Sequence, residues 1–210
     1  MSQRILKLDQ TELARAVRIL ARRDADLARV VKTYGPPPLW ARKPGFATLV
    51  YIILEQQVSL ASARAAYQRL HSAIAPITPR RFLTLDDTAL KAIGFSRQKM
   101  AYARQLAEAI NARRFTPSAL ATLDDAAARA MLIQLKGIGV WTADIYLMEA
   151  LLRPDIWPTG DLALAVATQQ VKRLRSRPTP DELESLGEAW RPWRAVAARI
   201  LWHHYLSERK

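Results

Sequence analysis

Apolar residues recur at every third or fourth position over most of the chain, which is the spacing of one face of an α-helix. Leu13, Val17 and Leu20 follow this spacing near the start, where Asp9 stands in a position suited to a helix N-cap. No stretch alternates apolar and polar residues for long enough to form a sheet. The pattern therefore predicts an all-α fold of about nine or ten helices. The longer ones are expected near 9–35, 45–71, 96–113, 124–135, 140–151, 161–175 and 190–207.

The chain carries far more basic than acidic side chains. Its 210 residues include 32 Lys and Arg against 19 Asp and Glu, which gives a formal net charge of +13. Hydrophobic residues make up 50% and charged residues 24%, a balance typical of a globular protein rather than of a disordered chain. The excess of positive charge favours a polyanionic partner, with nucleic acid as the first candidate and an anionic membrane surface as the second.

The sequence contains no cysteine. Disulfides, thiol nucleophiles, thiolate zinc sites and cysteine-bound iron–sulfur clusters are therefore excluded. The longest apolar stretch, residues 46–54, is far shorter than the ~20 residues that a membrane-spanning helix needs. No signal peptide is recognisable, so we expect an intracellular protein, located in the cytoplasm, on the nucleoid or in a nucleus.

Two predicted helices meet at a short turn with the sequence Lys136-Gly137-Ile138-Gly139. Glycine lets the backbone adopt positive φ and lets another molecule approach it closely. The turn leads into a helix N-terminus, whose unpaired N–H groups suit a phosphate, and Lys136 adds positive charge. A simpler interpretation stays open, in which a glycine caps the first helix and the turn has only a structural role.

A single aspartate, Asp161, follows 22 residues after Gly139. It stands directly before a predicted helix, where an aspartate usually serves as the N-cap. The same helix N-terminus would keep the carboxylate ionised, because the helix dipole stabilises an anion there. An ionised carboxylate beside a basic surface could also stabilise a cation that forms during a reaction.

Another glycine-containing turn opens the helix predicted at 96–113. Arg97 and Lys99 follow Ser96 in its first turn, where positive charges oppose the helix dipole. Basic residues at this place are more easily explained if a phosphate binds nearby.

Taken together, these motifs resemble those of the helix-hairpin-helix DNA glycosylases of base excision repair, the HhH-GPD superfamily. The hairpin at 135–143 and the aspartate segment at 160–164 have the order and spacing of that superfamily. The segments 53–59, with the sequence Ile-Leu-Glu-Gln-Gln-Val-Ser, and 190–194, with Trp-Arg-Pro-Trp-Arg, are similar to those of the DNA-3-methyladenine glycosylase II branch. The resemblance covers about residues 30–207 and is to the compact form, which lacks an N-terminal β-domain.

The resemblance implies a domain organisation. It predicts one glycosylase fold over residues 1–210, built as a two-lobed helical bundle with the active-site cleft between the lobes. Lobe A would span approximately 45–155 and contain the hairpin at 124–151. Lobe B would be formed by approximately 1–44 and 156–210.

The resemblance also implies roles for individual residues. Asp161 would be the catalytic carboxylate. Aromatic faces attract a positively charged alkylated base, and the base pocket would be lined by Trp141, Trp202, Trp40 and Phe46. DNA would be bound by Gln56, Gln57, Ser96, Arg97, Lys99, Lys136, Gly137, Ile138 and Gly139, with the two glutamines at the corner that enters the gap left by a flipped base. The backbone carbonyls of Ile133, Leu135 and Ile138 would hold a structural Na⁺ or K⁺, and no cofactor is required.

Position 141 separates the subclasses of this superfamily. Bifunctional relatives carry a lysine there, whereas this sequence has Trp141, which offers no amine for a Schiff base. The resemblance thus implies a type II DNA-3-methyladenine glycosylase without lyase activity, acting on 3-methyladenine or 7-methylguanine in double-stranded DNA and leaving an abasic site. We expect a monomer that needs neither a protein partner nor a membrane. Two alternatives stay open, namely a non-catalytic helix-hairpin-helix DNA-binding module and a glycosylase for an oxidised or deaminated base.

Overall fold

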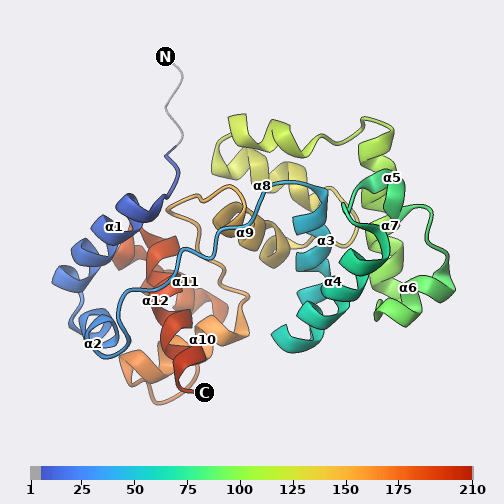
Figure 1. The fold of residues 1–210 in the computed structure, drawn as a ribbon. Helices are drawn as coiled ribbons and strands as arrows, with labels where there is room; N and C mark the ends of the chain where they lie inside the picture. The colour runs from blue at the N-terminus through green and yellow to red at the C-terminus, as the bar shows by residue number, and fades with distance from the viewer. Residues whose placement is uncertain (1–5, 210) are drawn as a thin grey trace. The chain divides into compact units, whose positions relative to one another are not determined.

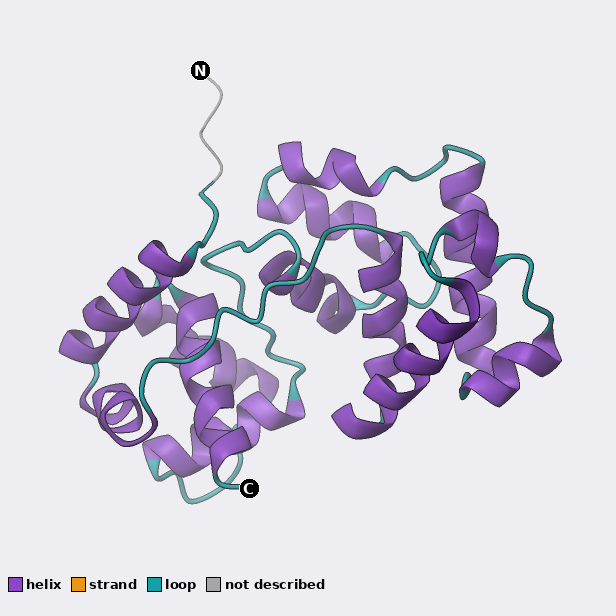
Figure 2. Cartoon of the chain, viewed as in Figure 1, coloured by secondary structure: helices purple, strands orange, loops and turns teal. Residues whose placement is uncertain are grey.

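In the computed structural model, which describes residues 6–209, every regular element is a helix (Figures 1 and 2). Residues 1–5 and 210 lie outside the described residues. The all-α prediction is confirmed for the described part of the chain. Its helices are α1 (Gln10–Arg23), α2 (Ala25–Tyr34), α3 (Phe46–Glu55), α4 (Leu60–Ile74), α5 (Pro79–Phe82), α6 (Asp87–Ile93), α7 (Arg97–Asn111), η1 (Pro117–Thr122), α8 (Asp125–Ile133), α9 (Val140–Glu149), α10 (Leu162–Lys172), α11 (Pro180–Gly187), η2 (Glu188–Trp190) and α12 (Arg194–Ser207), of which η1 and η2 are 3-10 helices.

Two of the predicted long helices are interrupted in the described residues. The helix predicted at 9–35 is broken at Asp24, which ends α1 and caps α2 in an extended conformation. The Asp24 carboxylate accepts hydrogen bonds from the backbone N–H groups of Asp26 and Leu27. The helix predicted at 45–71 is broken by the corner at 56–59, which separates α3 from α4. Periodicity alone did not reveal either break, since apolar spacing continues across both.

The chain divides into two compact units. The continuous unit is Arg42–Tyr146, and the discontinuous unit joins Met1–Ala41 to Leu147–Lys210. The second boundary thus falls inside α9 rather than near residue 155, where lobe A was expected to end. The reason is that the last turn of α9 and the segment after it bond within the discontinuous unit. Arg199 Nη2 donates to the Met148 carbonyl at 2.7 Å, and Leu8 N–H donates to the Leu152 carbonyl at 2.7 Å.

Helix α3 forms the centre of the continuous unit. It packs against α4 and α7, and α7 also packs against α5. The α3 side chains of Leu49, Val50, Ile52 and Ile53 are all fully buried. A helix that is apolar on every side is stable only when neighbours surround it, which explains why this uninterrupted apolar run is a helix in the middle of the unit.

Helix α12 has the same place in the discontinuous unit, where it packs against α1, α2 and α10. Its most unusual buried residue is Arg199, whose side chain is fully enclosed. The guanidinium donates to the carbonyl oxygens of Leu39, Ala195 and Met148 at 2.7–2.9 Å. Burial lowers the pKa of Arg199 to about 10. These bonds join three segments of the unit and orient the helix that carries Trp202.

Among the described residues, none of the helices combines the length and the apolar character that crossing a membrane requires.

Candidate functional site

The hairpin predicted from its glycines is present in the continuous unit. Helices α8 and α9 are joined by residues 134–139, and the turn is closed by a hydrogen bond from Ile138 N–H to the Leu135 carbonyl at 3.0 Å. An ion pair links the two helices, with Arg129 Nε 2.6 Å from Oδ1 of the buried Asp144. The Gly139 carbonyl accepts from Ala143 N–H at 3.0 Å and so begins α9. The turn is therefore held firmly at both ends.

The two glycines of the turn, Gly137 and Gly139, have different surroundings. Gly137 has φ +86°, and a Cβ placed on it would lie 2.1 Å from Cγ of Tyr102 on α7. Glycine is required there both by the positive φ and by the closeness of the Tyr102 ring. Gly139 has no such requirement, because a Cβ there would meet nothing within 4 Å. An open position next to a helix N-terminus leaves room for an external molecule to approach the backbone.

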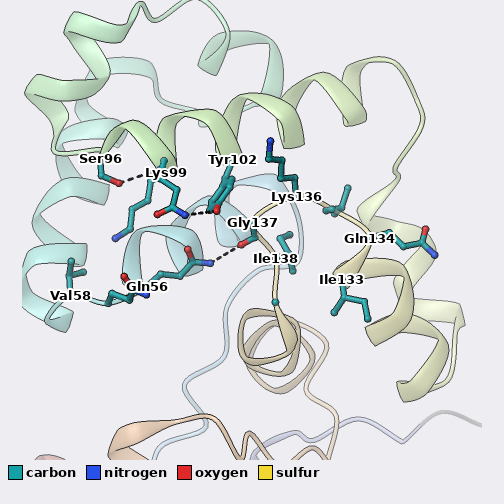
Figure 3. Close-up of a pocket in the computed structure, with 14 residues that line it drawn as sticks. Gln56, Val58, Ser96, Lys99, Tyr102, Ile133, Gln134, Lys136, Gly137 and Ile138 are labelled. Atoms are coloured by element: carbon teal, nitrogen blue, oxygen red, sulfur yellow. Dashed lines mark hydrogen bonds between the residues drawn. The ribbon is translucent and has the colours of Figure 1, made fainter.

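A hollow of about 720 Å³ lies beside the turn (Figure 3). Its described lining includes two lysines, Lys99 and Lys136, and no carboxylate, so its charge is positive. Most of the residues predicted to bind DNA line it together with the residues predicted to hold a cation, namely Gln56, Gln57, Ser96, Lys99, Ile133, Leu135, Lys136, Gly137, Ile138 and Gly139. The structure thus brings together side chains that are far apart in the sequence and forms a site suited to a phosphate.

The first turn of α7 forms one wall of this hollow. Ser96 is the N-cap, and its hydroxyl accepts from Lys99 N–H at 3.3 Å (Figure 3). Lys99 Nζ donates to the Leu54 carbonyl at 2.7 Å, in the last turn of α3, and burial lowers the pKa of this amine. Arg97 is exposed and does not line the hollow. Lys99 is therefore already bound to the protein, whereas Lys136 is exposed.

The predicted catalytic carboxylate lies in the discontinuous unit. Asp161 is the N-cap of α10, and its Oδ1 accepts from Leu164 N–H at 2.7 Å. The same oxygen accepts from the indole Nε1 of Trp202 on α12 at 3.0 Å. The capping role that the sequence suggested for Asp161 is therefore present, together with a second hydrogen bond that a simple cap does not require. Two donors on one oxygen fix the orientation of the carboxylate.

Trp202→Phe tests the second hydrogen bond, because phenylalanine keeps an aromatic ring and removes the indole N–H. We expect this variant to turn over about 10- to 100-fold more slowly, since a hydrogen bond to a charged group contributes about 1.5–3 kcal/mol. The measurement is the single-turnover rate on the substrate proposed below.

Trp190→Phe is the matched control in the same unit. Its indole Nε1 also donates to a carboxylate, Oδ2 of Asp24, at 2.8 Å. Burial alone would raise the pKa of Asp24, but hydrogen bonds from Trp190, Leu27 N–H and Lys172 hold it below its ordinary value. The control variant should lower the melting temperature and leave the rate per folded molecule unchanged. Equal rates for both variants would show that Trp202 does not act through Asp161.

The other predicted pocket residues have different surroundings. Trp40 is partly exposed, has φ +47°, and lies edge-on to His203 with 6.3 Å between ring centroids. Trp141 is partly exposed in the first turn of α9. Phe46 is 6% exposed and packs edge-on against the buried Phe82, with 5.7 Å between centroids. The structure therefore gives Phe46 a packing role in the core of the continuous unit, which its place within an apolar run already favoured.

The carbonyls predicted to hold a cation lie at the end of α8 and in the turn. The last carbonyls of a helix lack partners within the helix, which applies to Ile133. The Leu135 oxygen accepts one hydrogen bond from Ile138 N–H and has a second lone pair. Uncharged backbone oxygens are suited to a monovalent cation. Among the described residues, no cluster of His, Cys, Asp and Glu side chains is able to hold a metal ion.

Several residues of this site were not predicted from the sequence, and Tyr102 and Thr142 are two of them. The Tyr102 ring lies against Gly137, and the Thr142 hydroxyl accepts a hydrogen bond from Gln56 at 2.9 Å. Tyr102 lies one helical turn after Lys99, so it shares a face with a residue that was predicted. Thr142 lies next to Trp141 and carried no signal of its own.

Comparison with known proteins identifies the family to which this chain belongs. A model of the HhH-GPD superfamily of base excision DNA repair proteins matches residues 50–192, which is more than half of the chain. The chain belongs to this superfamily. The matched segment contains the hairpin, the 56–59 corner and Asp161.

Individual relatives agree with the HhH-GPD assignment. DNA-3-methyladenine glycosylase 1 of Schizosaccharomyces pombe is 29% identical over 180 residues, which cover 84% of this chain and 79% of that relative. A solved structure of 3-methyladenine DNA glycosylase from S. pombe in complex with abasic DNA has a TM-score of 0.82 and 29% identity, covering 90% of this chain and 95% of that one. The crystal structure of a DNA-3-methyladenine glycosidase from Bacillus halodurans has a TM-score of 0.74 and 26% identity, covering 98% of this chain and 95% of that one.

Proposed function

We propose that this HhH-GPD protein is a monofunctional DNA glycosylase, which removes N-alkylated bases from double-stranded DNA and leaves an abasic site. The observation that carries the proposal is Asp161, held by Leu164 N–H and the Trp202 indole at the start of α10. A pure DNA-binding module needs no carboxylate oriented by an aromatic side chain. The relatives named as 3-methyladenine glycosylases support the same substrate class for this chain.

The chemistry follows from the charge of the substrate. An N-alkylated purine such as 7-methylguanine is cationic, so it departs as a neutral base with the electron pair of the glycosidic bond. The sugar develops positive charge at C1′, which the Asp161 carboxylate stabilises. A water molecule then adds to C1′, and Asp161 or solvent takes its proton. The products are the free base and an abasic site, and no redox step is involved.

Two features of the hairpin belong to the same proposal. A backbone phosphate binds at Gly137–Gly139 in the positively charged hollow, and the carbonyls of Ile133, Leu135 and Ile138 would hold a Na⁺ or K⁺ in the turn. Trp141 supplies no amine, so the protein does not cleave the strand.

The test is incubation of methylated duplex DNA with the wild-type protein, followed by chromatography of the released bases. We expect methylated purines in the supernatant and a strand that breaks only after treatment with alkali. Borohydride should trap no covalent complex, because no Schiff base forms. A relative with a lysine at the position of Trp141 is the positive control for trapping.

The alternatives predict other results. Salt-sensitive DNA binding without release of any base is expected of a binding module. Release from oxidised or deaminated duplexes, with none from methylated DNA, would assign a different lesion. Either result contradicts the proposal.

A further inference from the structure

Two consecutive glutamines at the corner between α3 and α4 have opposite surroundings. Gln56 is half-buried, whereas Gln57 is exposed and has φ +57°. A residue other than glycine adopts this left-handed conformation only when its surroundings hold the backbone there. Contacts with neighbouring residues therefore hold the backbone of the corner at 56–59 in this conformation.

The side chain of Gln56 holds the corner by two hydrogen bonds to the hairpin. Its Nε2 donates to the Gly137 carbonyl at 2.9 Å (Figure 3). The same nitrogen donates to Thr142 Oγ1 at 2.9 Å. An amide group has two N–H donors, and both are used inside the protein. Gln56 thus bonds to the turn and to the first turn of α9, and it has no donor left for DNA. This placement changes its predicted role from a DNA contact to an internal link.

Helix α7 contacts both the end of α3, which leads into the corner, and the hairpin turn. Lys99 Nζ binds the Leu54 carbonyl in the last turn of α3, where a positive charge also stabilises the helix end. The ring of Tyr102 lies directly against Gly137, and its hydroxyl accepts a hydrogen bond from Gln98 Nε2 at 2.6 Å. The corner, the hairpin turn and α7 therefore form one connected framework around the hollow.

We propose that Gln56 is a positioning residue that joins the corner to the hairpin, so that a phosphate bound at the turn sets where Gln57 meets the duplex. The inference rests on the proposed function, because it assigns the corner to the step in which the base leaves the stack. Gln56 touches neither the base nor the sugar. Its effect passes through the backbone of the corner, which it keeps in register with Gly137.

The first test uses Gln56→Met, which keeps the length of the side chain, adds no charge and removes both donors. Single-turnover release is measured from a lesion in a matched pair and from the same lesion opposite a mismatched base. A mismatched lesion is already weakly paired and needs less help to leave the stack. We expect the variant to be roughly 10- to 100-fold slower on the matched duplex, in line with the effect of small misplacements, and much less impaired on the mismatched one.

A merely structural role gives a different pattern. Equal losses on the two duplexes would overturn the inference, as would an unchanged rate on the matched one. Thr142→Val removes one of the two acceptors and is the milder variant should Gln56→Met fail to fold. It is expected to show the same preference for the mismatched lesion with a smaller loss.

A double-mutant comparison with Gln57→Ala tests whether both residues act in one step. The combined variant should be no slower than the slower single variant, because the link has no further effect once Gln57 is truncated. Losses that multiply would mean that Gln56 acts independently, which contradicts the proposal.

Amide hydrogen exchange in the free protein separates this inference from the proposed function. In Gln56→Met, exchange should rise together at 56–59 and at 137–142, because the link between these segments is lost. Unchanged exchange in either segment overturns the inference whatever the enzyme assay shows. A wild-type protein that releases no methylated base overturns the proposed function, and it does so without altering the exchange result.

Discussion

Replacing Asp161 by asparagine should reduce base release by about 10³-fold, the size expected when a charge-stabilising and proton-accepting group is lost. Asparagine has the shape of aspartate and caps a helix equally well, so α10 should keep its bond from Leu164 N–H. Only the negative charge is lost. The variant should therefore melt near the wild-type temperature and bind undamaged duplex at least as tightly, since one repulsion with the phosphates is removed. Single-turnover release of methylated purines measures the rate.

Asp86→Asn is the matched control for this change. Asp86 caps α6 in the continuous unit, and its Oδ1 accepts from Ala89 N–H at 2.7 Å, the same distance as in the cap at Asp161. The control should leave release of methylated bases unchanged. Should Asp161→Asn keep more than about a tenth of the wild-type rate, stabilisation of the sugar cation by this carboxylate would be the wrong mechanism.

Gly137→Ala is the second change with a large expected effect. The backbone there has φ +86°, and the new Cβ would lie 2.1–2.5 Å from three ring atoms of Tyr102. Strain in the left-handed region and overpacking each cost about 1–3 kcal/mol, so we expect the unfolding free energy to fall by about 3 kcal/mol. The turn must shift away from Tyr102, and affinity for duplex DNA should fall with it. Thermal unfolding and fluorescence anisotropy measure the two effects.

Two companion variants divide this result into its causes. Tyr102→Ala in the Gly137→Ala background removes the ring and should recover the part of the stability that was lost to overpacking, but not the part lost to backbone strain. Gly139→Ala introduces the same methyl group where nothing lies within 4 Å. It should leave the melting temperature unchanged and weaken DNA binding about tenfold, because the methyl group stands where the phosphate approaches. Unaltered binding in Gly139→Ala would place the phosphate elsewhere.

The local features of this protein could be derived from its sequence. The helical period of the apolar residues specified an all-α chain, and the glycines of the turn at 136–139 marked the hairpin. Asp161 could be recognised as a helix cap because it directly precedes the residues of α10. Each of these inferences depends on neighbours within a few positions, where backbone geometry and hydrogen bonding are decided locally.

The links between distant segments were decided only by the tertiary structure. Gln56 bonds to Gly137, 81 positions later, and Trp202 bonds to Asp161, 41 positions earlier. Asp24 breaks the first predicted helix because its carboxylate is held by Trp190 and Lys172 as well as by its own backbone neighbours. An amide, an indole or a carboxylate has many possible partners in the chain, and only the packing of helices determines which of them comes within 3 Å. The sequence therefore determined the helical character of the chain and the residues able to bind or react. Tertiary packing determined where two of the predicted helices break and which of those residues orient one another.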